Sequence, residues 1–381
     1  MASKYNTWYH PYKTDAKYQK RAAYFSMEFG IHQALKIYSG GLGFLAGSHM
    51  ISARELKQNM IGIGMLWKYG YYDQGRNTDQ TLQTNFIEKH YNFLEDSGIQ
   101  VEVKIHDNPS VKVRAYVLKP EIFGSVPIYL LTTDVPGNDH LSKTITDHLY
   151  DNNTLTRISQ NIVLGIGGAK VVQELGGADV YHLNEGHALP AFYYLRNLGI
   201  TRNQMFFTTH TPEKAGNMER NGHLLNSCGF FGKTLTEDEL KKEVVNDDML
   251  NYTVAALRMA KKVNAVSKLH AVVANSMWNS FEGTTKIIPI TNSQNQGFWQ
   301  DNALARAWKS LNAKAFKRRK LELKSQLFDV VLDQTGKLFD PNVLTIVWAR
   351  RFAQYKRADL LLYDIERFEK LASSSTSARN I

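Results

Sequence analysis

Two segments place histidine, amide and carboxylate side chains directly after apolar runs. The first segment is His182-Leu183-Asn184-Glu185-Gly186-His187, which begins at the end of one apolar run and continues beyond it. The second is Thr208-Thr209-His210, at the end of another apolar run. These side chains can hydrogen-bond to polar ligands, and histidine also binds zinc. The spacing differs from the helical H-E-x-x-H pattern of zinc proteases, so a hydrogen-bonding rim is favoured over a metal site. The structural alternative is helix capping by Asn184, with Glu185 favourable to the helix dipole.

A second candidate is a group of cations between an apolar run and an amphipathic pattern. Residues 343–346 predict a buried strand and residues 358–365 predict a helix. The cations between them are Arg350, Arg351, Lys356 and Arg357. Ligands of open α/β sheets bind at the carboxyl ends of strands, and a helix N-terminus favours an anion. We therefore expect a phosphate-type site there.

A third candidate is the glycine-rich turn Ser39-Gly40-Gly41-Leu42-Gly43, which precedes a helical pattern over residues 44–56. Glycine lets the backbone approach a ligand closely, and N–H groups at a helix start bind oxyanions. The structural alternative is a tight turn with no ligand.

The elements that would position these residues follow an α/β pattern. Strands are expected at 24–27, 61–67, 179–183 and 205–209, helices at 155–175 and 185–198, and β-structure over 98–131. Alternation of strands and helices predicts a parallel sheet covered by helices. Residues 249–280 and 301–330 are expected to be rich in helix, with Asn264 to His270 at a helix-to-helix contact. Residues 317–320 are expected on a solvated helix face.

Composition narrows the classes of function. The 381-residue chain is 43% hydrophobic and carries a formal net charge of +10, with its cations scattered. We therefore do not expect nucleic acid as a partner. No apolar run approaches the ~20 residues that cross a bilayer, so no membrane contact is expected. A single cysteine, Cys228, and the lack of a signal-peptide pattern favour the cytoplasm.

Taken together, the ordered motifs resemble the α-glucan (glycogen/starch) phosphorylases, particularly their shorter bacterial and archaeal type. The similarity extends from about residue 22 to residue 372. Its blocks are residues 24–30, 37–43 with 45–47, 161–168, 182–187, 208–212, 266–270 and 350–357.

The resemblance implies a fold and a reaction. The implied fold is α/β of the glycosyltransferase B type, with the first Rossmann-like domain over residues 1–335 and only the beginning of the second over 336–381. The implied reaction is phosphorolysis of terminal α-1,4-glucosyl residues to α-glucose 1-phosphate, with retention. The implied partners are an α-1,4-glucan and inorganic phosphate, and a homo-oligomer is left open. Pyridoxal 5'-phosphate is the cofactor implied for the full-length family member.

The resemblance also assigns roles to residues of this sequence. Catalysis is assigned to Gly41, Arg351, Lys356 and His210. Substrate binding is assigned to Leu42, Asn184, Glu185, His187 and Asn292. Cofactor binding is assigned to Arg350 and Lys356.

This sequence departs from the family pattern at several points. Ser48 stands where aspartate is typical, and Ser293-Gln294-Asn295 follows Asn292 in place of Gly-Val-His. No counterpart of the Schiff-base lysine follows Arg357, so we expect a truncated second domain that does not bind the cofactor and leaves residues 340–381 poorly ordered or docked on a partner. Two alternatives stay open. One is an inactive remnant that binds glucan or phosphate, and the other is a nucleotide-sugar glycosyltransferase of the same architecture.

Overall fold

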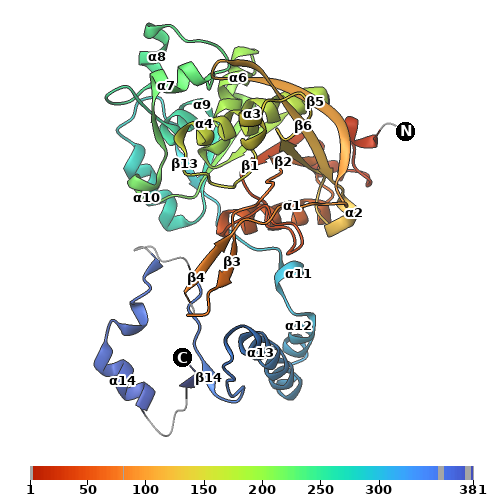
Figure 1. Ribbon diagram of the computed structural model, residues 1–381, viewed down its shortest axis with the longest axis vertical. Coiled ribbons are helices and arrows are strands. Elements are labelled where there is room, and N and C mark those ends of the chain that lie inside the picture. The colour runs from red at the N-terminus through yellow and green to blue at the C-terminus, as the bar shows by residue number, and fades with distance from the viewer. Residues whose placement is uncertain (1–2, 80, 351–355, 374–378, 381) are drawn as a thin grey trace. The chain divides into compact units, whose positions relative to one another are not determined.

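The computed structural model describes residues 3–79, 81–350, 356–373 and 379–380 (Figure 1). The chain forms two compact units, Met1–Asn295 and Gln296–Ile381. The boundary expected from the sequence, between residues 335 and 336, stays a prediction.

A nine-stranded sheet organises the first unit. Its strands are β1 (Ala22–Ser26), β2 (Met60–Met65), β5 (Glu95–Ile105), β6 (Asn108–Leu118), β7 (Ile128–Thr132), β8 (Val180–Asn184), β9 (Met205–Thr209), β12 (Lys262–Ala265) and β13 (Ile287–Pro289). They lie in the order β13-β12-β9-β8-β1-β2-β7-β6-β5. Seven of them are parallel, from β13 across to β7, and the β5–β6 hairpin continues the sheet in antiparallel pairing. Figure 1 shows this hairpin as a long curved ribbon.

The residue patterns explain the two parts of this sheet. β2 and β7 are almost entirely buried, as expected for parallel strands covered on both faces. β5 alternates buried and exposed residues from Ser97 to Ile105, which leaves one face of the hairpin in solvent.

Strand order identifies the place where a ligand site is expected. From β1 the chain adds β2 and β7 on one side, and then returns to add β8, β9, β12 and β13 on the other. This is the doubly wound order of Rossmann-like sheets, in which ligands bind beyond the carboxyl ends of the strands that flank the reversal. Here those strands are β1 and β8.

Helices cover the sheet. The longer ones in this unit are α1 (Gly41–Glu55), α4 (Thr154–Ile162), α5 (Gly168–Glu174), α6 (Pro190–Asn197), α7 (Gly222–Cys228), α8 (Glu237–Glu243), α9 (Tyr252–Met259) and α10 (Lys268–Trp278). Short elements are α2 (Pro120–Phe123), α3 (His140–Thr144), the β3–β4 hairpin (Asp73–Arg76, Leu82–Asn85) and the β10–β11 ribbon (Glu219–Asn221, Met249–Asn251).

The predicted helix over 155–175 is confirmed as α4 and α5 joined by a π-helical turn, Val163–Gly167. A Cβ at Gly165 would lie 2.7 Å from the backbone nitrogen of Ala191, and one at Gly168 would lie 2.7 Å from Ile63. These glycines therefore allow the close packing that the sequence suggested. The expected helix-to-helix contact at Asn264 was wrong, because Asn264 lies in strand β12, which runs directly into α10.

The second unit is helical in its first half. It contains α11 (Gln296–Trp299), α12 (Asn302–Lys309), α13 (Ala313–Thr335), β14 (Leu344–Thr345), a 3₁₀ turn (Leu360–Leu362), α14 (Ile365–Ser373) and β15 (Arg379–Asn380). The buried strand predicted at residues 343–346 was wrong. Among the described residues, β14 has two residues and pairs only with β15, and Leu344 is 57% exposed. A two-residue pairing cannot cover both faces of the apolar run.

Within the described ranges, no helix is both long enough and apolar enough to cross a membrane.

Candidate functional site

The candidate site lies at the carboxyl ends of β1 and β8, where the strand order reverses. Ser26 ends β1 and Asn184 ends β8, and the two residues are register partners. The Nδ2 of Asn184 donates to Oγ of Ser26 at 3.1 Å, inside the protein. The ends of β1 and β8 are therefore connected by a side-chain hydrogen bond as well as by backbone pairing.

Glu28 fixes the glycine turn beside this point. Its Oε2 accepts backbone N–H hydrogen bonds from Ser39 at 2.6 Å and Gly40 at 3.1 Å. Its Oε1 accepts the hydroxyl of Tyr150 at 2.6 Å. Hydrogen bonds to an ionised carboxylate are short and strong, so the turn that begins α1 is held firmly.

The start of α1 is open to a ligand. A Cβ at Gly40 or Gly41 would meet no described atom within 4 Å. Gly41 is the first residue of the helix, so its backbone N–H has no partner inside the helix. The glycine turn therefore combines a fixed backbone with space for an oxyanion.

His210, just beyond β9, completes the polar group at the switch point. Its Nε2 lies 2.6 Å from Oδ1 of Asn184. Burial, with His270 nearby, lowers the pKa of His210 to about 4. The ring is neutral near pH 7, and because an amide oxygen only accepts, its proton resides on Nε2. Nδ1 is then left as a hydrogen-bond acceptor.

Glu185 has a strained backbone, with φ of 69° directly after β8. Its Oε1 accepts the N–H of His210 at 2.5 Å and the hydroxyl of Thr211 at 3.3 Å, and its Oε2 accepts the N–H of Gly186 at 3.3 Å. Burial raises the pKa of Glu185, while these hydrogen bonds oppose the rise. A positive φ at a non-glycine residue is costly, and such strain gathers at functional sites. The helix cap considered for Asn184 was wrong. Asn184 ends strand β8, and its side-chain amide forms hydrogen bonds with Ser26 and His210.

A cavity of about 320 Å³ opens next to this group, on one face of the sheet. It is lined by Tyr24, His182, Thr208 and Asn264 of the strands, Leu45, Ser48, His49 and Ser52 of α1, and residues 290–294. The Nε2 of His182 donates to Oγ1 of Thr208 at 2.7 Å, and that hydroxyl donates to Oδ1 of Asn264 at 2.7 Å. Burial, with His49 and His210 nearby, lowers the pKa of His182 to about 3. The floor of the cavity is therefore neutral and polar.

The structure brings together most of the residues predicted in the first unit. Gly41 and Leu42 lie in the first turn of α1, and Asn184, Glu185 and His210 share hydrogen bonds. His187 lies on the following 3₁₀ turn, Gly186–Ala188, with its ring 5.7 Å from that of Tyr150. Asn292 is exposed and lines the cavity.

The cations predicted for the site belong to the second unit. Arg350 is exposed and Lys356 is partly buried. Arg351 lies outside the described residues. The roles assigned to these three cations stay predictions.

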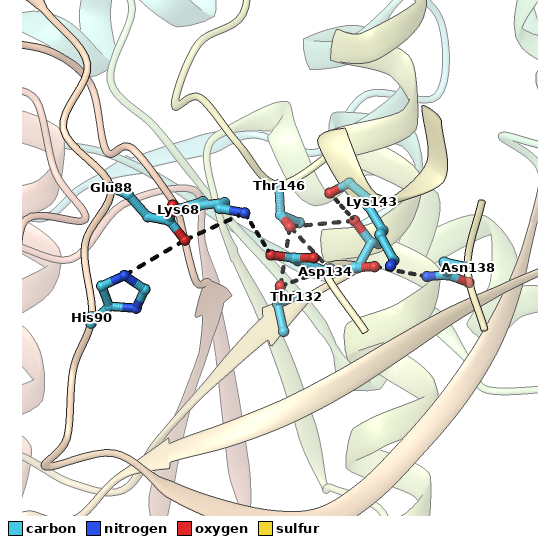
Figure 2. Close-up of polar contacts among 9 residues, drawn as sticks. Lys68, Glu88, His90, Thr132, Asp134, Asn138, Lys143 and Thr146 are labelled. Carbon is cyan, nitrogen blue, oxygen red and sulfur yellow. Dashed lines mark hydrogen bonds and ion pairs between the residues drawn. The ribbon is translucent and has the colours of Figure 1, made fainter. Parts of the chain in front are cut away.

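Two other cavities are less suitable as a ligand site. One of about 600 Å³ lies at the amino ends of β1 and β8, beside Arg21 and Asp179, at the wrong edge for a doubly wound sheet. Another of about 450 Å³ lies beyond β2 and β7. Figure 2 shows its Lys68 between the carboxylates of Glu88, at 3.4 Å, and Asp134, at 3.0 Å. Lys68 is held by two carboxylates, so it is not free to bind an anionic ligand in this cavity.

The sequence did not indicate that Glu28 bonds to Tyr150 or that His182 bonds to Thr208. Glu28 and Tyr150 are 122 residues apart, so no local pattern links them. The sequence did contain one indication of this role, since Glu28 lies between the apolar residues Met27 and Phe29 just after a strand. Across the described residues, no group of three or more His, Cys, Asp or Glu side chains is arranged to hold a metal ion.

The sequence of this chain is similar to those of several known proteins. An uncharacterized protein of Methanocaldococcus jannaschii is 47% identical over 355 residues, covering 92% of this chain and 68% of that protein. The maltodextrin phosphorylase of Thermococcus litoralis is 33% identical over 420 residues, covering 94% of this chain and 50% of that enzyme. A glycogen phosphorylase of Mycobacterium tuberculosis is 30% identical over 432 residues, covering 92% and 49%. No family model matches the chain.

The chain spans about half the length of these two phosphorylases. The similarity nevertheless extends over more than nine-tenths of this chain. The chain therefore belongs to one family with the Methanocaldococcus jannaschii protein, and it is similar to the maltodextrin and glycogen phosphorylases over about half of their length.

Proposed function

We propose that this protein is an α-glucan phosphorylase of the two-domain glycosyltransferase B architecture. It would transfer the terminal α-1,4-linked glucosyl residue of glycogen, starch or maltodextrin to inorganic phosphate. The observation that carries the proposal is the glycine turn held open at the start of α1, beside Asn184 and His210, in a chain 33% identical to a maltodextrin phosphorylase. The single cysteine supports a cytoplasmic location.

The reaction sets the demands on the site. The bond between C1 and the glycosidic oxygen breaks, a phosphate oxygen bonds to C1, and the departing glucan hydroxyl takes the proton of the phosphate. The products are α-glucose 1-phosphate and a glucan shortened by one residue. Positive charge develops at C1 next to a phosphate, so fixed N–H donors must support the anion.

The residues of the first unit suit the sugar side of this reaction. The N–H of Gly41 would face the substrate phosphate, and that of Leu42 would lie near the sugar. His210, neutral and held by Asn184, would accept a sugar hydroxyl at Nδ1. Asn292 would contact the 6-hydroxyl.

Further groups extend this assignment. Glu185 and His187 would line the same site, and Arg350, Arg351 and Lys356 of the second unit would supply positive charge to phosphate.

Pyridoxal phosphate is the cofactor that the resemblance implies, and it would add a second phosphate to the reaction. The described side chains that meet at the switch point are Ser26, Glu28, Tyr150, Asn184, Glu185 and His210. None of them is a lysine that could form a Schiff base, so these residues do not by themselves fit the cofactor. No step of the reaction is assigned to it here.

The proposal is tested by an activity assay with phosphate. Residues 1–372 would be fused to the part of the Methanocaldococcus jannaschii relative that this chain does not cover, and incubated with maltoheptaose, with and without phosphate. We expect glucose 1-phosphate only when phosphate is present. A folded fusion that yields no glucose 1-phosphate contradicts the proposal. Binding of UDP-glucose, measured on the same protein, would instead favour a nucleotide-sugar glycosyltransferase.

A further inference from the structure

Two arginines of the first unit lie partly buried with no carboxylate partner. Arg157 belongs to α4, with its guanidinium 5.0 Å from the ring centre of Tyr150. Within the described part of the chain it makes no hydrogen bond or ion pair through its side chain. Arg220 belongs to β10, and its side chain donates only to the backbone carbonyl of Glu219, at 2.9 Å, among the residues described. Buried cations are normally paired, so two unpaired ones need an explanation.

The fold brings these arginines into one place. β10 pairs with β11, which leads directly into Tyr252 at the start of α9. Tyr252 lies against the turn that carries His187, because a Cβ at Gly186 would lie 3.1 Å from the Cβ of Tyr252. Tyr150, under Arg157, lies 5.7 Å from the ring of His187.

The electrostatics agree with this proximity. Burial lowers the pKa of the Arg157 guanidinium, and the charge of Arg220 lowers it further. Burial raises the pKa of Tyr252, and both arginines oppose that rise. The two positive charges therefore repel each other in a partly buried setting, and a bound anion would relieve the repulsion.

His187 adds a polar group without a partner. Its Nδ1 has no exposed surface and no hydrogen bond to any described residue. Burial lowers the pKa of His187 to about 3, with Arg157 and His210 contributing. The neutral ring can still donate one N–H to an anion.

Nearby carboxylates do not neutralise the pair. Asp151 acts on Arg157 electrostatically but forms no ion pair with it among the described residues. The carboxylate of Glu219 accepts a hydrogen bond from Asn251 at 2.8 Å.

We propose that Arg157 and Arg220, with His187, form a binding site for a phosphate-type dianion that adjoins the proposed glucan site at His187 and is distinct from the glycine turn. Two guanidinium groups match a tetrahedral oxyanion in charge and in donor geometry. The anion is either inorganic phosphate or the phosphate of a sugar monoester, which share this chemistry.

The site has a direct link to the glycine turn. Arg157 covers Tyr150, the hydroxyl of Tyr150 donates to Glu28, and Glu28 holds the N–H groups of Ser39 and Gly40. Through these contacts, occupation of the arginine site would act on the backbone that would receive the substrate phosphate.

Calorimetry tests the proposal on the 381-residue chain. Inorganic phosphate and glucose 6-phosphate are titrated separately into the wild type, Arg220→Gln and Arg157→Gln. Loss of a charge-assisted hydrogen bond should weaken at least one titrant by about tenfold or more in both variants. The titrant that depends on the arginines identifies the source of the phosphate group.

Arg196→Gln is the matched control. Arg196 also lies over a tyrosine ring, 4.9 Å from that of Tyr193, but it is paired with Glu243 at 2.9 Å. We expect anion affinity to be unchanged in this variant. Unchanged affinity in Arg220→Gln and Arg157→Gln, or an equal loss in Arg196→Gln, overturns the proposal. If Arg157→Gln does not fold, Arg220→Gln decides alone. The result is independent of glucose 1-phosphate release, so the two proposals fail separately.

Discussion

At the scale of single residues, Glu28 is the group on which the geometry of the site depends. It is 2% exposed, and its two oxygens receive three hydrogen bonds, two from the glycine turn and one from Tyr150, 122 residues further along the chain. A buried carboxylate is stable only when its oxygens are satisfied in this way. Loss of one donor should therefore be felt both in stability and in the glycine turn.

Tyr150→Phe removes one of these donors. We expect the free energy of unfolding to fall by about 1.5–3 kcal/mol, the range for a hydrogen bond to a charged group. Urea unfolding measures the change. Tyr194→Phe is the control, because its hydroxyl donates to Gln173 at 3.0 Å in an exposed position. Equal losses in the two variants would show that Glu28 does not need Tyr150.

His182 makes stability depend on pH. Burial lowers its pKa to about 3. Below about pH 6.5, His182 is therefore protonated in the unfolded chain but stays neutral in the folded chain. Stability is therefore lost as the pH falls below that value, by roughly 1.4 kcal/mol per pH unit until the folded pKa is approached.

His182→Gln removes this contribution. Between about pH 7 and about pH 5, the wild type should lose about 2 kcal/mol more than His182→Gln in urea unfolding. His90→Gln is the control, since the side chain of His90 is 83% exposed. The same pH dependence in wild type and His182→Gln would refute the assignment.

At the scale of elements, α1 is placed by one close backbone contact. A Cβ at Gly47 would lie 2.1 Å from the carbonyl oxygen of Gly30. Gly47 thus allows the helix to approach the backbone of the segment after β1, two residues beyond Glu28. Close helix packing of this kind tolerates no added methyl group.

Gly47→Ala should therefore destabilise the protein strongly, by about 3 kcal/mol or more, as expected for overpacking against backbone. Gly41→Ala, in the same helix, meets open space and should change stability by no more than about 0.5 kcal/mol. Thermal unfolding of both variants measures the difference. A tolerated Gly47→Ala would mean that α1 can shift, and the account of the turn would be wrong.

The strands and helices differed in how well their sequences predicted them. β9 was predicted with its bounds, because Met205 to Thr209 is a short run bounded by polar residues. β12 was missed because Lys262-Val263-Asn264-Ala265 carries only two apolar residues, and its place in the sheet comes from pairing with β9 and β13. The run at 343–346 was misread because apolar composition alone does not show whether a strand finds partners.

At the scale of the whole chain, the sequence predicted the α/β class and which residues lie at the switch point. It did not predict which of these residues contact one another. Asn184 and His210 followed apolar runs, so their position at the sheet edge was predictable. Their 2.6 Å contact, the Tyr150–Glu28 pair and the Arg157–Arg220 pair join residues distant in the chain. Such pairings depend on strand order, which no local pattern contains.

Calorimetry with maltoheptaose tests the central claim, that the switch point of the first unit binds glucan. The chain of 381 residues can be used directly, with Asn292→Ala as the probe variant. Asn292 is exposed, so its removal should leave folding intact. Asn203→Ala is the control, because Asn203 is also exposed but precedes β9 at the amino edge of the sheet. The account predicts binding to the wild type and to Asn203→Ala, and roughly fivefold weaker binding to Asn292→Ala. A flat titration with the wild type, or equal affinity in all three proteins, would contradict it.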